Sequence, residues 1–218
     1  MPLTRVRIGR LFNTDPMFTT QFIRLMAAAD DFNTAISSFE RLPKPASRTT
    51  ELRFNGQRLY YLRLACGHLD EANQIIKQLQ NDFSELLVQG PPNLAEAYMK
   101  IAATISPLEE MLTRLRNNAL FHHEDAELTE ALQEWGPDGE GVIVTGEGLD
   151  DTRYSVADEA VSQAIRRIFG FPGDIEENRR AFEDLTDQLT SLRTDLLDYV
   201  HWLLDAVGEL FPETVEAL

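Results

Sequence analysis

Hydrophobic residues recur every three or four positions along most of the chain, and this spacing predicts helices. The longest such runs predict helices over about residues 16–42, 62–86 and 175–210. The last run keeps its spacing through four heptads, which is typical of a seam between packed helices. Two interpretations stay open, because the seam either packs within its own bundle or joins two copies of the chain. Its apolar positions are Phe182, Leu185, Leu189, Leu192, Leu196, Tyr199, Leu203, Ala206 and Leu210.

Turn-forming residues separate the predicted helices. Thr14-Asp15-Pro16 combines an oxygen-bearing cap with a proline in the first turn, which predicts a helix start. Gly90-Pro91-Pro92-Asn93 predicts the end of one helix and the beginning of the next. Pro107 predicts a kink or a fresh turn after Ser106, and a further short helix is expected over about residues 157–169.

The segment 136–157 differs from the rest, because glycine and acidic residues surround a short β-branched run there. Val142-Ile143-Val144 and Arg153-Tyr154-Ser155-Val156 predict the two strands of a small hairpin. The predicted fold class is therefore all-α, an antiparallel helical bundle with one β-hairpin insertion near residues 142–156. A length of 218 residues is typical of one domain, so we predict a single helical domain over residues 1–218.

Composition narrows the class of protein. The one cysteine, Cys66, cannot form an intramolecular disulfide or a cysteine-based zinc cluster, which is consistent with a reducing compartment. No apolar run approaches the roughly 20 residues that a membrane helix needs. The N-terminal region also has no uninterrupted apolar stretch of the kind found in signal peptides. We therefore expect a cytoplasmic protein that does not enter a membrane.

The net charge of −16 opposes general attraction to nucleic acid, since phosphate binding depends largely on lysine and arginine. The charge is uneven along the chain, however. Residues 1–63 carry a net charge of +5, whereas residues 64–218 carry −21. Either the N-terminal part offers a basic surface, or the asymmetry only keeps a helical protein in solution.

The most distinctive chemistry lies between Arg116 and Glu124, where the sequence reads Arg-Asn-Asn-Ala-Leu-Phe-His-His-Glu. A guanidinium group offers a planar fork to phosphate oxygens, and an imidazole exchanges a proton near neutral pH. These groups suit phosphodiester chemistry without a metal. On an unbroken helix Arg116 lies about 20° from His123 but about 120° from His122, so helical geometry alone favours His123.

The same segment resembles the signature of the HEPN superfamily (higher eukaryotes and prokaryotes nucleotide-binding), in which an arginine and a polar residue precede a histidine at a spacing of four to six residues. Arg116, Asn117 and His122 occupy those positions, and a phenylalanine precedes the histidine as in related bacterial proteins. The stretch Arg58–Ala72 is similar to the helix that pairs with this motif. The resemblance covers about residues 54–135.

This resemblance implies a helical bundle that is usually a homodimer and often a metal-independent endoribonuclease without cofactors. Some members are toxins paired with a nucleotidyltransferase antitoxin. In that scheme Arg116 stabilises the phosphate, His122 acts as general acid or base, and the RNA's own 2′-OH is the nucleophile. Asn117 supports the site by hydrogen bonding, and His123 is a supporting residue and the alternative to His122.

Two further expectations concern the surroundings of the motif and the class of function. If RNA binds, we expect Arg53, Arg58 and Arg63 to form a basic rim near the cleft. In a purely structural interpretation, Arg116 pairs with a glutamate of the preceding turns and His122 caps the helix. The corresponding alternative function is a non-catalytic, acidic helical protein that binds a basic protein partner.

Overall fold

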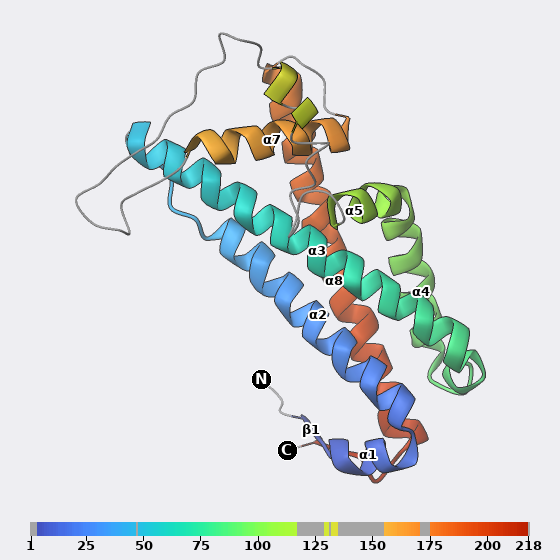
Figure 1. Ribbon diagram of the computed structural model, residues 1–218. Helices are drawn as coiled ribbons and strands as arrows, with labels where there is room; N and C mark the ends of the chain where they lie inside the picture. The colour runs from blue at the N-terminus through green and yellow to red at the C-terminus, as the bar shows by residue number, and fades with distance from the viewer. Residues whose placement is uncertain are drawn as a thin grey trace. The chain divides into compact units, whose positions relative to one another are not determined.

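The computed structural model describes residues 4–46, 48–116, 129–130, 132–134, 155–170 and 175–217, and most of these are helical (Figure 1). The predicted all-α fold class is confirmed for this part of the chain. None of the described helices is both long and apolar enough to cross a membrane. The helices are α1 (Ile8–Thr14), α2 (Pro16–Glu40), α3 (Arg48–Leu87), α4 (Pro92–Ile105), the 3₁₀ helix η1 (Ser106–Leu108), α5 (Glu109–Leu115), α7 (Ser155–Phe169) and α8 (Ile175–Leu210).

Several helix boundaries follow the local signals in the sequence, although α3 begins at Arg48 rather than near residue 62. The side chain of Asp15 caps α2, because its Oδ1 accepts a hydrogen bond from the backbone N–H of Phe18 at 2.9 Å. Pro107 lies in η1, which separates α4 from α5 where a fresh turn was predicted. The predicted bounds of α8 are confirmed at both ends, and α2 ends two residues earlier than predicted.

Contacts group the chain into two compact units, which we describe separately. Unit 1 comprises Met1–Phe32, His68–Glu109 and Gln188–Leu218, and unit 2 comprises Asn33–Gly67 and Glu110–Asp187. The divisions fall inside the long helices α2, α3 and α8 and after the first residue of α5. This grouping does not decide the number of domains, so the single domain stays a prediction.

Unit 1 is an antiparallel bundle of helical segments (Figure 1). Arg24 of α2 pairs with Glu71 of α3, and Asp31, two turns further along α2, lies 3.7 Å from His68 of α3. Because the partner number falls as the α2 number rises, these two segments run in opposite directions. The short connection between α3 and α4 likewise makes those two helices antiparallel neighbours.

A buried carboxylate joins α4 to α8 in unit 1. Asp195 is 5% exposed; its Oδ1 lies 2.8 Å from Lys100 Nζ, and its Oδ2 accepts a hydrogen bond from Thr104 Oγ1 at 3.1 Å. The hydrogen bond and the charge of Asp195 raise the pKa of Lys100. A buried charge needs such partners, so this cluster fixes the register of the two helices.

The long apolar seam on α8 packs within its own chain. From Leu189 to Ala206, its residues in unit 1 are at most 1% exposed. The alternative, a seam between two copies of the chain, is therefore wrong for this stretch. The homodimer stays a prediction that rests on the family resemblance alone.

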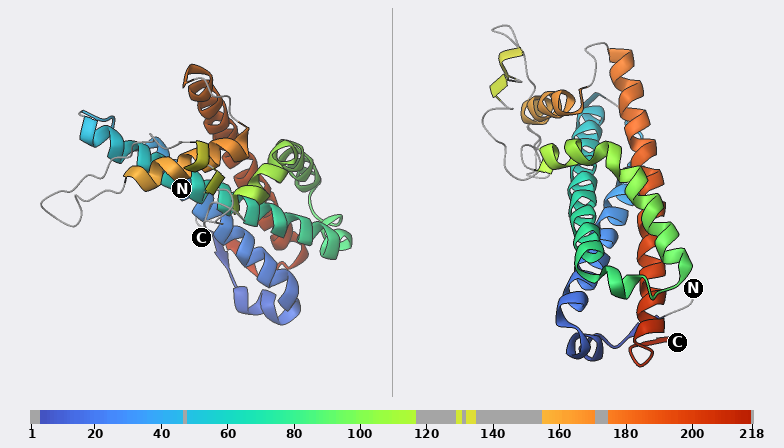
Figure 2. Two further views of the ribbon diagram at one scale, coloured as in Figure 1. Left: turned by 45° about the horizontal axis from the view of Figure 1, so that its top comes forward. Right: turned by 90° about the vertical axis from the view of Figure 1, so that its right-hand side faces the viewer.

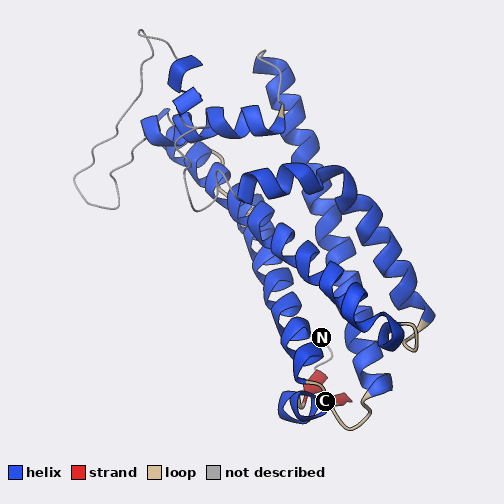
Figure 3. Ribbon diagram, turned by 45° about the vertical axis from the view of Figure 1, so that its right-hand side comes forward, coloured by secondary structure: helices blue, strands red, loops and turns tan. Residues whose placement is uncertain are grey.

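Two short strands pair the ends of the chain in unit 1 (Figure 3). β1 (Thr4–Val6) runs antiparallel to β2 (Val215–Ala217), with Arg5 opposite Glu216. The sequence did not predict this pair, because three residues are too few to show an alternating pattern. The N- and C-terminal ends of the described chain consequently lie side by side, as the right-hand view of Figure 2 also shows.

The predicted hairpin falls mostly outside the described residues, which do not include residues 135–154. Its last two residues, Ser155 and Val156, are described, and they begin α7 rather than a strand. The helical spacing of the following apolar residues extends back to these positions and determines their conformation. The buried residues of that face are Ala160, Val161, Ala164, Ile165 and Ile168.

Cys66 is predicted to be unreactive in the folded protein. It is fully buried in α3, and burial raises the pKa of its thiol to about 12. Since the thiolate is the reacting form, we expect modification by a disulfide reagent at pH 8 to be about 10³-fold slower than in the unfolded chain. Rapid modification of the native protein would contradict this expectation. Denatured protein is the control, and the reagent should modify one thiol per chain in it.

The same shift predicts a pH dependence of stability. The pKa of Cys66 is higher in the folded state than its ordinary value of 9.0. The thiol therefore contributes stability that is complete below about pH 9 and is lost as the pH rises toward 12. A Cys66→Ala variant should show a weaker decline of the unfolding free energy across that range than the parent protein. An identical decline in both proteins would assign it to other groups.

Candidate functional site

The described part of the predicted catalytic segment is Arg116. This residue ends the described stretch of chain and is exposed, whereas Leu112 and Leu115 of α5 are buried in unit 2. Arg116 thus follows directly on the buried face of α5. Asn117, His122 and His123 lie outside the described residues, so their roles stay predictions.

The three arginines of the predicted basic rim lie on α3 in unit 2. The side chain of Arg53 is outside the description. Arg63 is half-buried, and its Nε has no hydrogen-bond partner in the described structure, although the residue makes another interaction. Arg58 is half-buried, whereas a residue of a basic rim would be exposed.

Arg58 lies among aromatic rings. Its guanidinium carbon is 4.7 Å from the ring centre of Phe182, 5.0 Å from that of Phe39 and 5.4 Å from that of Phe54. Burial lowers the pKa of Arg58, and the charge of Glu183 partly opposes this effect. The cation therefore holds α2, α3 and α8 together within unit 2.

We expect Arg58→Ala to lower the unfolding free energy by about 1–2 kcal/mol, because it removes the cation–π contacts and the packing of the aliphatic stem. Chemical denaturation measures this loss. Arg41→Ala is the matched control, since Arg41 is exposed in the turn after α2 and its truncation should cost less than about 0.5 kcal/mol. Equal stability of the two variants would contradict a structural role for Arg58.

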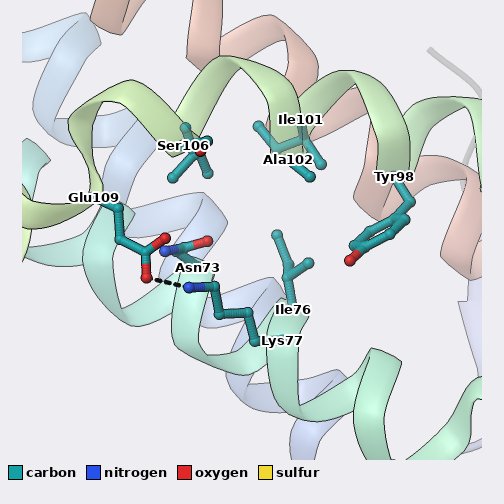
Figure 4. A pocket seen from close by; sticks show the side chains of 9 residues that line it. Asn73, Ile76, Lys77, Tyr98, Ile101, Ala102, Ser106 and Glu109 are labelled. Carbon is teal, nitrogen blue, oxygen red and sulfur yellow. Dashed lines mark hydrogen bonds and ion pairs between the residues drawn. The ribbon is translucent and has the colours of Figure 1, made fainter.

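A cavity of about 190 Å³ lies in unit 1 between α3 and α4 (Figure 4). Its middle is apolar, with Ile76 of α3 facing Ile101 of α4. One end is polar, because Lys77 of α3 and Glu109 of α5 form an ion pair there. Tyr98 lies at the other end, with its hydroxyl directed toward α3. The remaining lining residues are Asn73, Ala102, Ile105 and Ser106.

Asn73 is the unusual member of this lining. It is 5% exposed, and its Nδ2 has no hydrogen-bond partner in the described part of the protein. Figure 4 shows its amide beside the pair formed by Lys77 and Glu109, below Ser106. A buried donor without an acceptor is costly, so the amide can supply a hydrogen bond to a molecule in the cavity.

Tyr98 is supported from behind by a second tyrosine. The ring centres of Tyr98 and Tyr199 are 6.3 Å apart, and Tyr199 is fully buried on α8. Burial raises the pKa of Tyr199 to about 12. The neutral, well-packed ring of Tyr199 therefore helps to hold the Tyr98 end of the cavity in place.

Sequence reasoning did not single out this cavity, although one signal was visible. Asn73 interrupts the apolar stripe of α3, between Leu69 four residues before it and Ile76 three residues after it. An amide on a buried helical face indicates a specific partner. The lining residues that come from α4 and α5 could not be predicted, because they reach the cavity only through the packing of the helices.

Comparisons with family models, with curated proteins and with solved structures found no match to the chain. The resemblance to the HEPN superfamily therefore rests on the motif residues themselves. Among the described residues, no three or more His, Cys, Asp or Glu side chains are grouped so that they could hold a metal ion.

Proposed function

We propose that the chain is a HEPN-like, metal-independent endoribonuclease that acts as a homodimer, as a toxin or as a defence or stress protein. One observation carries this proposal. Exposed Arg116, the first residue of the motif, belongs to the same compact unit as residues 33–67. That stretch contains six Lys or Arg and two Asp or Glu, which makes it basic in an otherwise acidic chain.

The local charge matters because RNA binding depends on phosphate contacts rather than on the net charge of the whole protein. Arg58 is engaged with phenylalanine rings, so it adds positive potential but is poorly placed to move toward a phosphate. Arg53 and Arg63 are then the main candidates for the proposed rim. Unit 2 is accordingly the proposed site of RNA binding.

The proposed reaction needs only protein side chains and the substrate. The 2′-OH of the ribose attacks the adjacent phosphorus while His122 of one copy removes its proton. The bond from phosphorus to the 5′ oxygen breaks, and the partner subunit's His122 donates a proton to that leaving oxygen. Arg116 stabilises the negative charge that develops on the phosphate oxygens. The products are a 2′,3′-cyclic phosphate and a 5′-OH end.

Incubation with single-stranded RNA in the presence of EDTA tests the proposal. We expect cleavage products with 2′,3′-cyclic phosphate ends and no cleavage of DNA of the same sequence, since DNA lacks the 2′-OH. Intact RNA, together with co-purification of a basic protein, would instead favour the acidic binding protein. Light scattering of the purified chain tests the proposed homodimer.

A further inference from the structure

We propose that the cavity between α3 and α4 in unit 1 binds a free α-amino acid with a branched or aromatic apolar side chain. This inference concerns other residues than the proposed ribonuclease motif, whose described residue, Arg116, belongs to unit 2. It rests on the volume of the cavity, on the order of its polar and apolar lining, and on a buried amide without a partner.

The volume limits the ligand to a small molecule. An apolar cavity of about 150 Å³ is large enough to bind benzene, so about 190 Å³ accommodates a molecule slightly larger than benzene. Nucleotides, peptides and most cofactors are too large for this space, since their sites usually exceed about 300 Å³. Single apolar amino acids are within this size range.

The charges at the polar end favour a zwitterion. The side chains of Lys77 and Glu109, which are 44% and 36% exposed, already form an ion pair, so this end carries one positive and one negative group and has no net charge. A simple anion would have to displace Glu109 from Lys77, and a simple cation would have to displace Lys77 from Glu109. A zwitterion instead places its carboxylate near Lys77 and its ammonium near Glu109, so that neither charge is left unpaired.

The buried amide and the apolar middle orient the ligand. Asn73 Nδ2 lies beside the charged end and can donate a hydrogen bond to the ligand carboxylate (Figure 4). From there the cavity continues between Ile76 and Ile101 toward Tyr98. An apolar side chain extending from the α-carbon would fill this part, whereas glycine would leave it empty.

Calorimetric titration of the full chain with L-leucine, L-isoleucine and L-phenylalanine tests the proposal. We expect saturable binding of at least one of them at millimolar concentration. 4-Methylpentanoate, which is leucine without the ammonium, and isoamylamine, which is leucine without the carboxylate, should each bind at least about 10-fold more weakly than leucine. The first leaves Glu109 without a new charged partner, and the second leaves Lys77 without one. Equal binding of 4-methylpentanoate would overturn the proposal that the ligand is a zwitterion, and no binding of any of these amino acids would overturn the site.

Variants locate the binding. Asn73→Ala should weaken binding of the best amino acid about 10-fold or more, since a hydrogen bond to a charged carboxylate is lost. Ala102→Phe fills the cavity from the α4 side and should abolish binding. Gln78→Ala is the matched control, because Gln78 is exposed next to Lys77 and does not line the cavity. Thermal unfolding without ligand verifies that each variant is folded.

The pattern across the variants decides the outcome. If Ala102→Phe binds as tightly as the parent protein, the amino acid binds elsewhere and the proposal is wrong. If Asn73→Ala is too unstable to purify, Ala102→Phe and Lys77→Met provide the same test, because Ala102 is only partly buried and Lys77 is exposed. We expect the rate of RNA cleavage to be unchanged in these variants, so a failure of amino-acid binding can be distinguished from a failure of the ribonuclease proposal.

Discussion

Replacing His122 by alanine, or Arg116 by alanine, is expected to slow metal-independent RNA cleavage by about 10²- to 10⁴-fold. His122 is the proposed general acid or base, and loss of such a group usually has an effect of that size. Arg116 offsets the charge that forms on the phosphate in the transition state, so its loss should have a comparable effect. Single-turnover cleavage of a labelled RNA in EDTA measures both rates.

Neither change should disturb the fold. Arg116 is exposed, so its truncation removes little buried apolar area, and the far-ultraviolet circular dichroism should be nearly unchanged. Arg114→Ala is the matched control, because Arg114 is also exposed and lies two residues earlier in α5. It should cleave RNA at the parent rate if the effect is specific to the motif.

His123→Ala separates the two ways of assigning the histidine. The family spacing selects His122, whereas the geometry of an unbroken helix selects His123. An active His122→Ala together with an inactive His123→Ala would shift the assignment by one residue. A parent protein that cleaves no RNA under any condition tried would remove the ribonuclease proposal altogether.

The helices were largely predictable from sequence because their signals are local. The cap at Asp15, the proline at position 107 and the sustained spacing in α8 each determine a boundary within a few residues of chain. The pair of short strands was not predictable in the same way. Its partners lie at opposite ends of the chain and become neighbours only through the fold.

The candidate sites depend on tertiary packing and were only partly predictable. The sequence placed Arg58 in a basic cluster, but three phenylalanines from α2, α3 and α8 surround it in unit 2. Similarly, Asn73 was visible as an amide on an apolar face, whereas Lys77 and Glu109 are 32 positions apart and meet only in the folded protein. Residue type predicts the chemistry that is available, and packing decides which groups act together.

Leu196→Ala is expected to lower the unfolding free energy of the protein by about 2–5 kcal/mol. Leu196 is fully buried in the seam of α8, so its truncation removes apolar contacts and leaves a cavity. Leu197 provides a closely matched control, since it is the next residue of the same helix and is 38% exposed. Leu197→Ala should cost less than about 1 kcal/mol, because its side chain is already partly in water.

Trp202 offers a local probe for this comparison, since it lies on α8 within unit 1. The chain has two tryptophans, so a Trp135→Phe background assigns the fluorescence change on denaturation to Trp202. Because the seam is covered within one chain, the loss should appear in the unfolding free energy and leave the mass measured by light scattering unchanged. An effect of Leu197→Ala as large as that of Leu196→Ala would contradict the special role of the buried seam. A change of mass caused only by Leu196→Ala would contradict its packing within one chain.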